Sequence, residues 1–222
     1  MIVCAAIVAQ IQHESSIKDF RKLVGQTKQV CGRVVTYSIV GDDSSGNCSF
    51  QLDIGTPYWR PTFYVSVPGE VAEDRPVARP ERYLSQDVCV TGLVQSDKKR
   101  TPHIAVSSSA QITIKDEQPN PPFGEGARRL CESGIIRPKL LREVKPNYTR
   151  DLMARKAEDK VLLQAVVGTD GSITDVRTVY AMYADMSAEA MKAIRQWKMS
   201  PATSRGAPVP VIVEIEEKFT LR

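Results

Sequence analysis

In the first half of the chain, apolar residues tend to alternate with polar ones, which is the two-residue period of half-buried β-strands. The runs are rich in β-branched and aromatic residues, and turn-forming strings such as GDDSSGN and DKKRT separate them. Short helices are predicted at Ile17 to Leu23 and at Pro80 to Leu84. The predicted strands cover residues 29–40, 48–55, 62–69, 87–96 and 102–114. This half is therefore predicted to be all-β.

In the second half, the pattern alternates between helical and strand periods. Thr149 is a good N-cap for a short amphipathic helix that follows it. Two apolar runs, Val161 to Val167 and Ile173 to Val179, flank the string GTDGS. Its Asp170-Gly171 pair is a strong hairpin signal, because glycine tolerates the positive φ that tight turns require. We therefore expect a helix followed by a β-hairpin.

A second helix and a final strand are predicted after the hairpin. Ser187 is the expected N-cap of AEAMKAIRQWKM, in which Trp197 anchors an apolar stripe at helical spacing. The last strand is predicted over Val209 to Leu221, where Glu217 interrupts an otherwise apolar face. The apolar members of that face are Val209, Val211, Val213, Ile215, Phe219 and Leu221.

The string DEQPNPPFGEG, at residues 116–126, divides the two halves. Its prolines and glycines cannot sustain a helix or a strand ladder, so we interpret it as a linker. A length of 222 residues suits two domains. The predicted organisation is a leader at 1–14, an all-β domain at 15–116, a linker at 117–135 and an α+β domain at 136–222.

The strings VCGRVV, CSFQLDIGTPYWRPTFYVSV, DVCVTGLV and HIAVSSSAQITI resemble small bacterial OB-fold domains over about residues 24–114. The resemblance implies a five-stranded Greek-key barrel, with a helix or loop between the third and fourth strands. OB-folds bind many kinds of ligand, so the fold says little about function.

The strings PKLLREVKPNYT, VLLQAVVGTDGSITDVRTV and AMKAIRQWKMSPATSRGAPVPVIVEIEEKFTL resemble the TonB C-terminal domain. The departures are Thr149, where the family has proline, and Asp159-Lys160, where it usually has glycine. The resemblance implies the order helix, β-hairpin, helix, strand. It also implies a non-enzymatic protein in the periplasm or cell envelope of a Gram-negative bacterium, linked to energy-dependent transport.

TonB-like domains are understood to recognise segments of outer-membrane receptors by strand addition, so an envelope protein or receptor peptide is the expected partner. The sequence does not tell which strand forms the open edge. The final strand is the candidate for this partner-binding edge. Its candidate partner-binding residues are Val209, Val211, Val213, Ile215, Glu217 and Phe219.

The segment Met1 to Ile11 is apolar and resembles the core of a secretory signal, although it lacks a basic region before it. An N-terminal strand is the alternative interpretation. The run is shorter than the roughly 20 residues that span a bilayer. Coupling to the inner-membrane proton-motive motor is therefore expected only if an upstream anchor exists.

Five cysteines (Cys4, Cys31, Cys48, Cys89 and Cys131) form no CxxC pair, and His13 and His103 are the only histidines, so no metal or other cofactor is predicted. The cysteines fit buried thiols or long-range disulfides. In an OB barrel the first strand pairs with the fourth, which brings Cys31 and Cys89 together. The predicted disulfide is Cys31–Cys89, with Cys48 near a hairpin loop and Cys131 beyond the linker.

An alternative hypothesis is a cytoplasmic nucleic-acid-binding OB protein. Aromatic residues gather in the second and third predicted strands, where OB-folds stack bases. Residues 1–118, however, carry 13 basic and 13 acidic residues, and so lack the net positive charge that a polyanion attracts. The charge balance thus argues against nucleic acid as a partner, and no nucleophile-base pattern indicates an enzyme. The aromatic residues are Phe50, Tyr58, Trp59, Phe63 and Tyr64.

Overall fold

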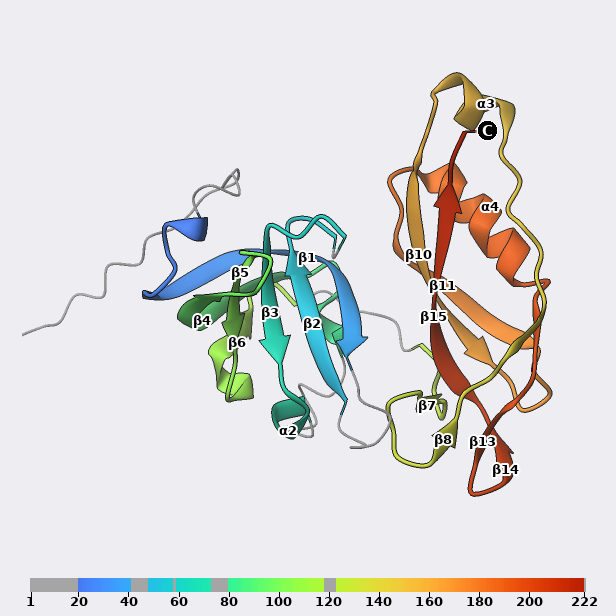
Figure 1. Cartoon of the computed structure of the whole chain (residues 1–222), viewed down its shortest axis with the longest axis horizontal. Helices are drawn as coiled ribbons and strands as arrows, with labels where there is room; N and C mark the ends of the chain where they lie inside the picture. Colours follow the sequence, from blue (N-terminus) through green and yellow to red (C-terminus); the bar gives the residue numbers. More distant parts are fainter. Residues whose placement is uncertain (1–19, 41–47, 58, 73–79, 118–122, 222) are drawn as a thin grey trace, which may run out of the picture.

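The computed structural model describes residues 20–40, 48–57, 59–72, 80–117 and 123–221 (Figure 1). The described chain forms an N-terminal module up to residue 117 and a C-terminal module from residue 123, each built on its own β-sheet. The apolar start of the chain, the first three residues of the helix expected at Ile17 to Leu23 and the string GDDSSGN lie outside these ranges. Within them, no helix is long and apolar enough to cross a bilayer.

The strands of the N-terminal module close into a ring. β1 pairs with both β2 and β4, β3 pairs in parallel with β5, and β5 pairs with β4. One helical turn (α2, Gly69–Ala72) and a 3₁₀-helix (η1, Pro80–Tyr83) lie between β3 and β4. The sequence predicted a short helix at the position of η1. The strands are β1 (Thr27–Val40), β2 (Ser49–Ile54), β3 (Phe63–Val67), β4 (Asp87–Ser96), β5 (Pro102–Ala105) and β6 (Ile112–Ile114).

The last predicted strand of this module, residues 102–114, is wrong as a single strand. β5 and β6 are separated by a 3₁₀-helix, η2 (Ser109–Gln111). The hydroxyl of Ser108 accepts a hydrogen bond from the Ala110 amide, and the Gln111 side chain bonds back to the Ser108 amide. Serine side chains that bind nearby backbone groups compete with a strand ladder in this way.

The C-terminal module has a sheet in the order β11-β10-β15-β7, with a helix packed on one face. That helix, α4, contributes buried apolar side chains to a core with Trp197 and the inner face of the sheet. Thr149 caps α3 as predicted, because its hydroxyl accepts from the Leu152 amide at 3.3 Å. The main elements are α3 (Arg150–Ala154), β10 (Asp159–Val167), β11 (Ile173–Tyr180), α4 (Ala184–Ile194) and β15 (Val211–Phe219).

The predicted hairpin joins β10 to β11, and its turn requires a glycine. Gly171 has a φ of +76°, and a Cβ built there would lie 1.8 Å from the carbonyl oxygen of Met199. The turn therefore packs directly against the backbone that follows α4, which positions the end of the hairpin.

The boundaries of α4 differ from the prediction. The helix begins at Ala184 with Tyr183 as its N-cap, and Ser187 is a buried residue inside it whose hydroxyl bonds to that of Thr178. Trp197 lies beyond the end of the helix, is 7% exposed, and donates from Nε1 to the Val144 carbonyl at 2.9 Å. The prediction of Ser187 as the N-cap is therefore wrong. Its hydroxyl forms its hydrogen bond with Thr178 on β11 instead of with the start of the helix.

The last predicted strand is interrupted at Pro210, which has no N–H to donate to a ladder. Residues before it form β14 (Ala207–Val209), which pairs with β13 (Ala202–Ser204), while β15 begins after it and joins the main sheet. Val209 is thus separated from the strand that carries the other predicted residues.

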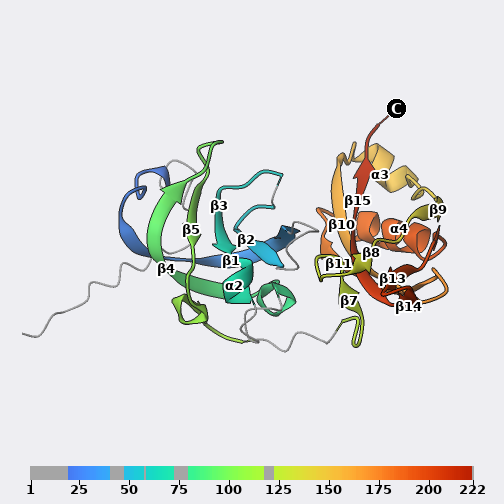
Figure 2. The same cartoon turned by 60° about the horizontal axis from the view of Figure 1, so that its bottom comes forward.

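Segments of the expected linker join the C-terminal module. β7 (Arg128–Arg129) pairs in parallel with the start of β15, and β8 (Ile135–Ile136) pairs with β13. A further short ladder joins β9 (Leu140–Arg142) to β12 (Lys198–Met199). The sheet of β10, β11 and β15 lies between the N-terminal module and α4 (Figure 2).

Candidate functional site

One edge of the C-terminal sheet is open over most of its length. β15 pairs with β10 continuously, from Val211 opposite Val167 to Phe219 opposite Asp159. On its other side, only Val211 and Ile212 are paired, with β7. Within the described chain, no strand pairs with that side between Val213 and Phe219. An edge of this kind presents main-chain N–H and C=O groups to which a further strand can add.

The predicted partner-binding side chains do not point to that edge. Residues 211, 213, 215, 217 and 219 alternate onto the inner face of the sheet, against α4, and Val209 lies in β14. The five on β15 are between 0% and 7% exposed. A partner at this edge would therefore contact the main chain of β15. The five side chains are Val211, Val213, Ile215, Glu217 and Phe219.

Glu217 is the acidic residue on the inner face of β15, and it is 4% exposed. Burial raises the pKa of its carboxyl group above the ordinary value, and the nearby charge of Lys145 opposes that rise. Lys145 in turn forms an ion pair with Glu143. A charged cluster therefore lies at the inner side of the open edge, which the sequence showed only as an interruption of an apolar face.

The outer face of β15 is charged along the same stretch. Glu216 forms ion pairs with Lys160 at 3.0 Å and with Lys218 at 3.7 Å. Desolvation raises the pKa of Glu214 to about 7, which Arg129 opposes and Glu81 reinforces. The Glu214 residue as a whole remains exposed to solvent, whereas its carboxyl group is desolvated by the protein atoms around it. A strand added here would place its outward side chains beside these residues.

The opposite edge of the sheet, β11, is more crowded. The N-terminal module approaches the end of β11 and leaves a shallow hollow of about 420 Å³ between the modules. Val34, Val35 and Ser85 line it on one side, and Thr178 and Tyr180 on the other. β1 thus stands opposite the end of β11, and no described strand pairs with the outer side of β11.

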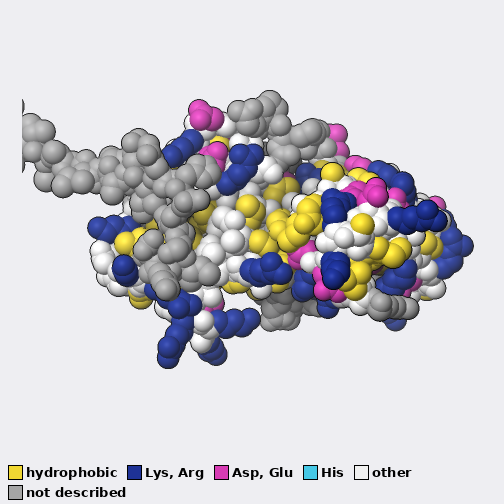
Figure 3. Space-filling model, turned by 90° about the horizontal axis from the view of Figure 1, so that it is seen from above, with side chains coloured by type: hydrophobic (Ala, Val, Ile, Leu, Met, Phe, Trp, Pro, Cys, Tyr) yellow, Lys and Arg dark blue, Asp and Glu magenta, His cyan; other side chains and the backbone are white. Residues whose placement is uncertain are grey.

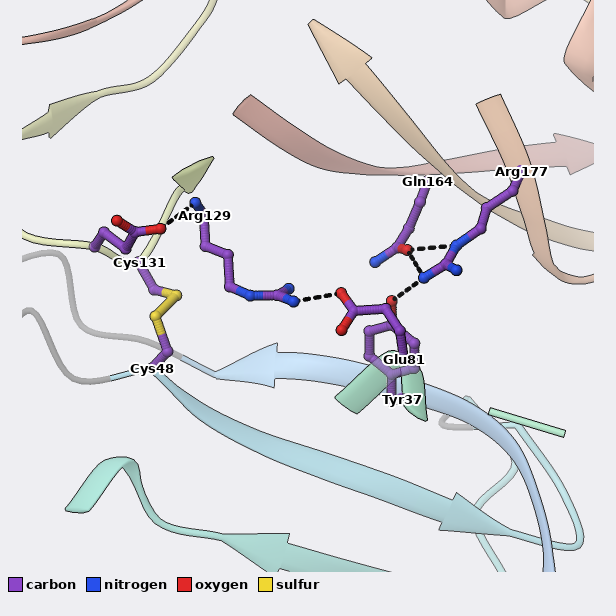
Figure 4. A network of polar contacts seen from close by, with 8 residues as sticks. Tyr37, Cys48, Glu81, Arg129, Cys131, Gln164 and Arg177 are labelled. Carbon is purple, nitrogen blue, oxygen red and sulfur yellow. Dashed lines mark hydrogen bonds and ion pairs between the residues drawn. A yellow bond between two sulfur atoms is a disulfide. The ribbon is translucent and has the colours of Figure 1, made fainter. Parts of the chain in front are cut away.

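The two modules share a buried polar network on the outer face of the sheet (Figure 4). Arg177 donates to the Gln164 amide oxygen at 2.8 and 3.0 Å and to the Tyr37 hydroxyl at 3.3 Å. Glu81 of η1 accepts from Arg129 of β7 at 2.5 Å. Apolar residues of the same face, Leu162 and Val179 among them, extend the core of the N-terminal module. The modules therefore pack as one body along this face.

Two disulfides are present among the described residues. Cys31 and Cys89 are directly opposite each other on β1 and β4, with a Cα separation of 4.0 Å, and form the pair expected from the sequence. The second disulfide joins Cys48 to Cys131, with Cα atoms 5.4 Å apart. The sequence interpretation missed it, because the contact depends on how the modules pack and the residues are 83 positions apart.

Among the described residues, the aromatic side chains proposed to stack on bases do not form one platform. Phe50 and Phe63 are buried in the core, and Tyr58 lies outside the described residues. Trp59 packs edge-on against Tyr180 of the C-terminal module, with ring centroids 5.0 Å apart. The remaining Tyr64 stacks on His103. On the face shown in Figure 3, Lys and Arg side chains of the C-terminal module are dispersed among acidic and neutral ones.

Comparison with known proteins finds a family match within the C-terminal module. Residues 144–221 match the family model of the Gram-negative bacterial TonB protein C-terminal domain. Among solved structures, the chain is similar to the solution NMR structure of the Pseudomonas aeruginosa TonB C-terminal domain, with 27% identity and a TM-score of 0.34. That similarity covers 43% of this chain and 94% of the other. A search of curated proteins finds no match. Residues 144–221, about the last third of the chain, are thus similar to the TonB C-terminal domain family.

Proposed function

We propose that this chain is a non-enzymatic binding protein of the TonB type that takes an extended segment of an envelope protein as an added strand on β15. The observation that carries the proposal is the open edge from Val213 to Phe219, in a module that matches the TonB C-terminal family. The family supports a role in transport and a location in the Gram-negative cell envelope. An outer-membrane receptor segment is the proposed partner.

The geometry predicts that the partner is bound mainly through its main chain. The inner-face side chains of β15 are buried, so an added strand meets N–H and C=O groups first. Each net hydrogen bond contributes about 0.5–1.5 kcal/mol. Side-chain preference would come from the outer face, where Glu216 and Lys218 stand beside the added strand.

We propose further that the N-terminal module, residues 15–116, is an OB-fold. The ring β1-β2-β3-β5-β4-β1 supports this proposal, because it is a closed five-stranded Greek-key arrangement. The TonB-type module is proposed for residues 136–222 and the connecting segment for 117–135, within which β7 and the first residue of β8 pair with strands of the C-terminal module. A leader at 1–14 is part of the same proposal, and coupling to the inner-membrane motor is proposed only if an upstream anchor exists.

Strand addition is tested by NMR titration of the ¹⁵N-labelled full chain with overlapping synthetic peptides from the periplasmic segments of outer-membrane receptors. The expected result is that amide shifts concentrate on Val213–Phe219. Alanine replacement in a binding peptide should change affinity little. Methylating the backbone nitrogens of alternate peptide residues should abolish binding in one phase of alternation and spare it in the other, since only one edge of a strand faces β15.

Two results would contradict the proposal. One is a set of shifts confined to the exposed face of α4, around Lys192 and Arg195. The other is equal binding of both N-methylated peptides, because a ligand held by side chains alone does not distinguish them.

A further inference from the structure

β7 occupies the first two positions of the edge that the proposed function uses. Arg128 and Arg129 lie opposite Val211 and Ile212 in a parallel pairing. The Arg128 amide donates to the Pro210 carbonyl at 2.8 Å. A strand of two residues has too few ladder contacts to hold itself in place. Something other than the pairing must therefore keep β7 on β15.

The contacts that hold β7 come from the N-terminal module. Arg129 pairs with Glu81 at 2.5 Å, and the two side chains are only 17% and 14% exposed, so solvent screens this pair less than a surface pair. Two residues further on, Cys131 is bonded to Cys48 at the start of β2 (Figure 4). The chain turns away immediately after β7, where Glu132 accepts a hydrogen bond from the Arg129 amide at 2.6 Å.

The residues just before β7 lie flat on the sheet. Gly124 has a φ of +63°, and a Cβ built there would lie 2.9 Å from the side chain of Ile212 and 3.1 Å from that of Val166. Nearby, the Arg177 guanidinium lies 4.5 Å from the ring centroid of Phe123. The segment before β7 is thus in close contact with the outer face of the sheet, and the segment after β7 is bonded to the N-terminal module.

We propose that the N-terminal module is part of the strand-binding site: through β7 it acts as an end stop that confines an added strand to Val213–Phe219. The inference rests on the proposed function. An added strand that extended past Val213 would need the outward main-chain groups at the start of β15 that β7 lies against, among them the Pro210 carbonyl that accepts from the Arg128 amide. The paired part of the partner is therefore an extended segment of about seven residues, roughly 23 Å long at 3.3 Å per residue.

The end stop also fixes register. Val211, Val213 and Ile215 are similar apolar residues at a two-residue spacing. A partner strand displaced by two residues would still turn each of its side chains to the same face of the sheet and would lose few favourable contacts. The β15 strand alone therefore specifies the register of the partner weakly. A fixed obstacle at Ile212 removes the displaced arrangements that run onto the start of β15.

The anchoring is tested without a partner by amide hydrogen exchange of Arg128. The variant Cys48→Ser/Cys131→Ser/Arg129→Gln removes the disulfide and the ion pair, and Cys31→Ser/Cys89→Ser is the control that removes a disulfide within the N-terminal module. Exchange of the Arg128 amide should become at least about tenfold faster in the first variant and stay unchanged in the control. Retained protection of Leu163 shows that the sheet is intact in both. Unchanged Arg128 exchange in the first variant would overturn the anchoring.

The effect on binding is tested with peptides selected on the full chain from a phage-displayed library of random peptides, synthesised at seven and nine paired residues. In the native chain, the two added residues should change affinity less than about twofold. In the released variant they should raise it about fivefold or more, since two or more further hydrogen bonds form. Nitroxide labels on the peptide ends report the register.

The outcomes separate the two proposals. A nine-residue peptide that pairs with Val211 and Ile212 in the native chain would overturn the end stop and leave strand addition standing. Strand addition to neither protein would overturn the proposed function, and the end stop with it.

Discussion

Arg177 on β11 donates a hydrogen bond of 3.3 Å to the hydroxyl of Tyr37 on β1, although the two residues are 140 positions apart. Tyr37 is 0% exposed, and burial raises the pKa of its hydroxyl far above the usual range, so the group remains protonated. Arg177 is held in turn by two hydrogen bonds to Gln164. A buried polar network therefore links the N-terminal module to the sheet of the C-terminal module.

Arg177→Ala should destabilise the whole chain. It leaves the Gln164 amide oxygen and the Tyr37 hydroxyl buried without their donor, which costs about 1–3 kcal/mol for each such group. Tyr37→Phe removes one partner only and should cost about 1 kcal/mol. Urea unfolding measures both. The double variant should lose less free energy of unfolding than the two single variants lose in total, because the two residues share one network. Full additivity would show that the pair is not coupled.

Trp197→Ala should unfold the C-terminal module at moderate denaturant concentrations. The indole is 7% exposed within the core between α4 and the sheet, and truncation of such a side chain costs about 3–5 kcal/mol. Trp197→Phe is the matched control, since it keeps most of the volume and loses the hydrogen bond to Val144. Its cost should be smaller. A Trp197→Ala protein with the native melting temperature would assign the indole to the surface.

Features set by neighbouring residues could be predicted from the sequence. The Asp170-Gly171 turn, the Thr149 cap and the Cys31–Cys89 pairing follow from local chemistry or from the order of strands. The alternation of the last strand was also correct, but it was interpreted as a partner-binding face. The same alternation buries Val213 and Ile215 against α4, so what remains for a partner is the main chain.

Features set by the packing of the two modules could not be predicted. β7 is a pair of arginines in a proline- and glycine-rich stretch, and nothing in its own sequence favours a strand. Its position depends on Glu81 and Cys48, which come from distant parts of the chain. The odd number of cysteines, five, also hid the second disulfide, because counting alone does not pair them.

Stability should fall as pH rises through the range in which Asp53 ionises. Burial raises the pKa of this carboxyl group to about 6, although hydrogen bonds from Gln51 and Thr36 oppose the rise. The unfolded chain releases this proton near pH 3.9. Between about pH 4 and pH 6 the folded state therefore binds more protons than the unfolded state, so the free energy of unfolding decreases with pH.

The comparison that isolates Asp53 is Asp53→Asn, measured by urea unfolding from pH 4 to pH 7.5. The asparagine variant should lack a destabilisation that is on the order of 2–3 kcal/mol in the native protein between those limits. Glu214, whose pKa is raised to about 7, contributes in the same direction, so Glu214→Gln is measured alongside. Identical pH slopes for the native protein and Asp53→Asn would show that Asp53 ionises normally in the fold.

The Cys31–Cys89 disulfide should form when the protein is exported to an oxidising compartment. The two cysteines face each other across β1 and β4, so closure follows from the strand pairing and requires no movement of the backbone. The bond closes a loop of 58 residues, and the chain-entropy model gives about 4 kcal/mol of stabilisation for a loop of that length. Cys31→Ser/Cys89→Ser should therefore lower the melting temperature of the exported protein. The same variant made in a reducing cytosol should melt close to the native chain produced there, since neither has the bond. Mass spectrometry of the exported protein, digested without reduction, should recover the Cys31 and Cys89 peptides as one linked species. Recovery of both cysteines as free thiols would exclude the disulfide and argue against an envelope location.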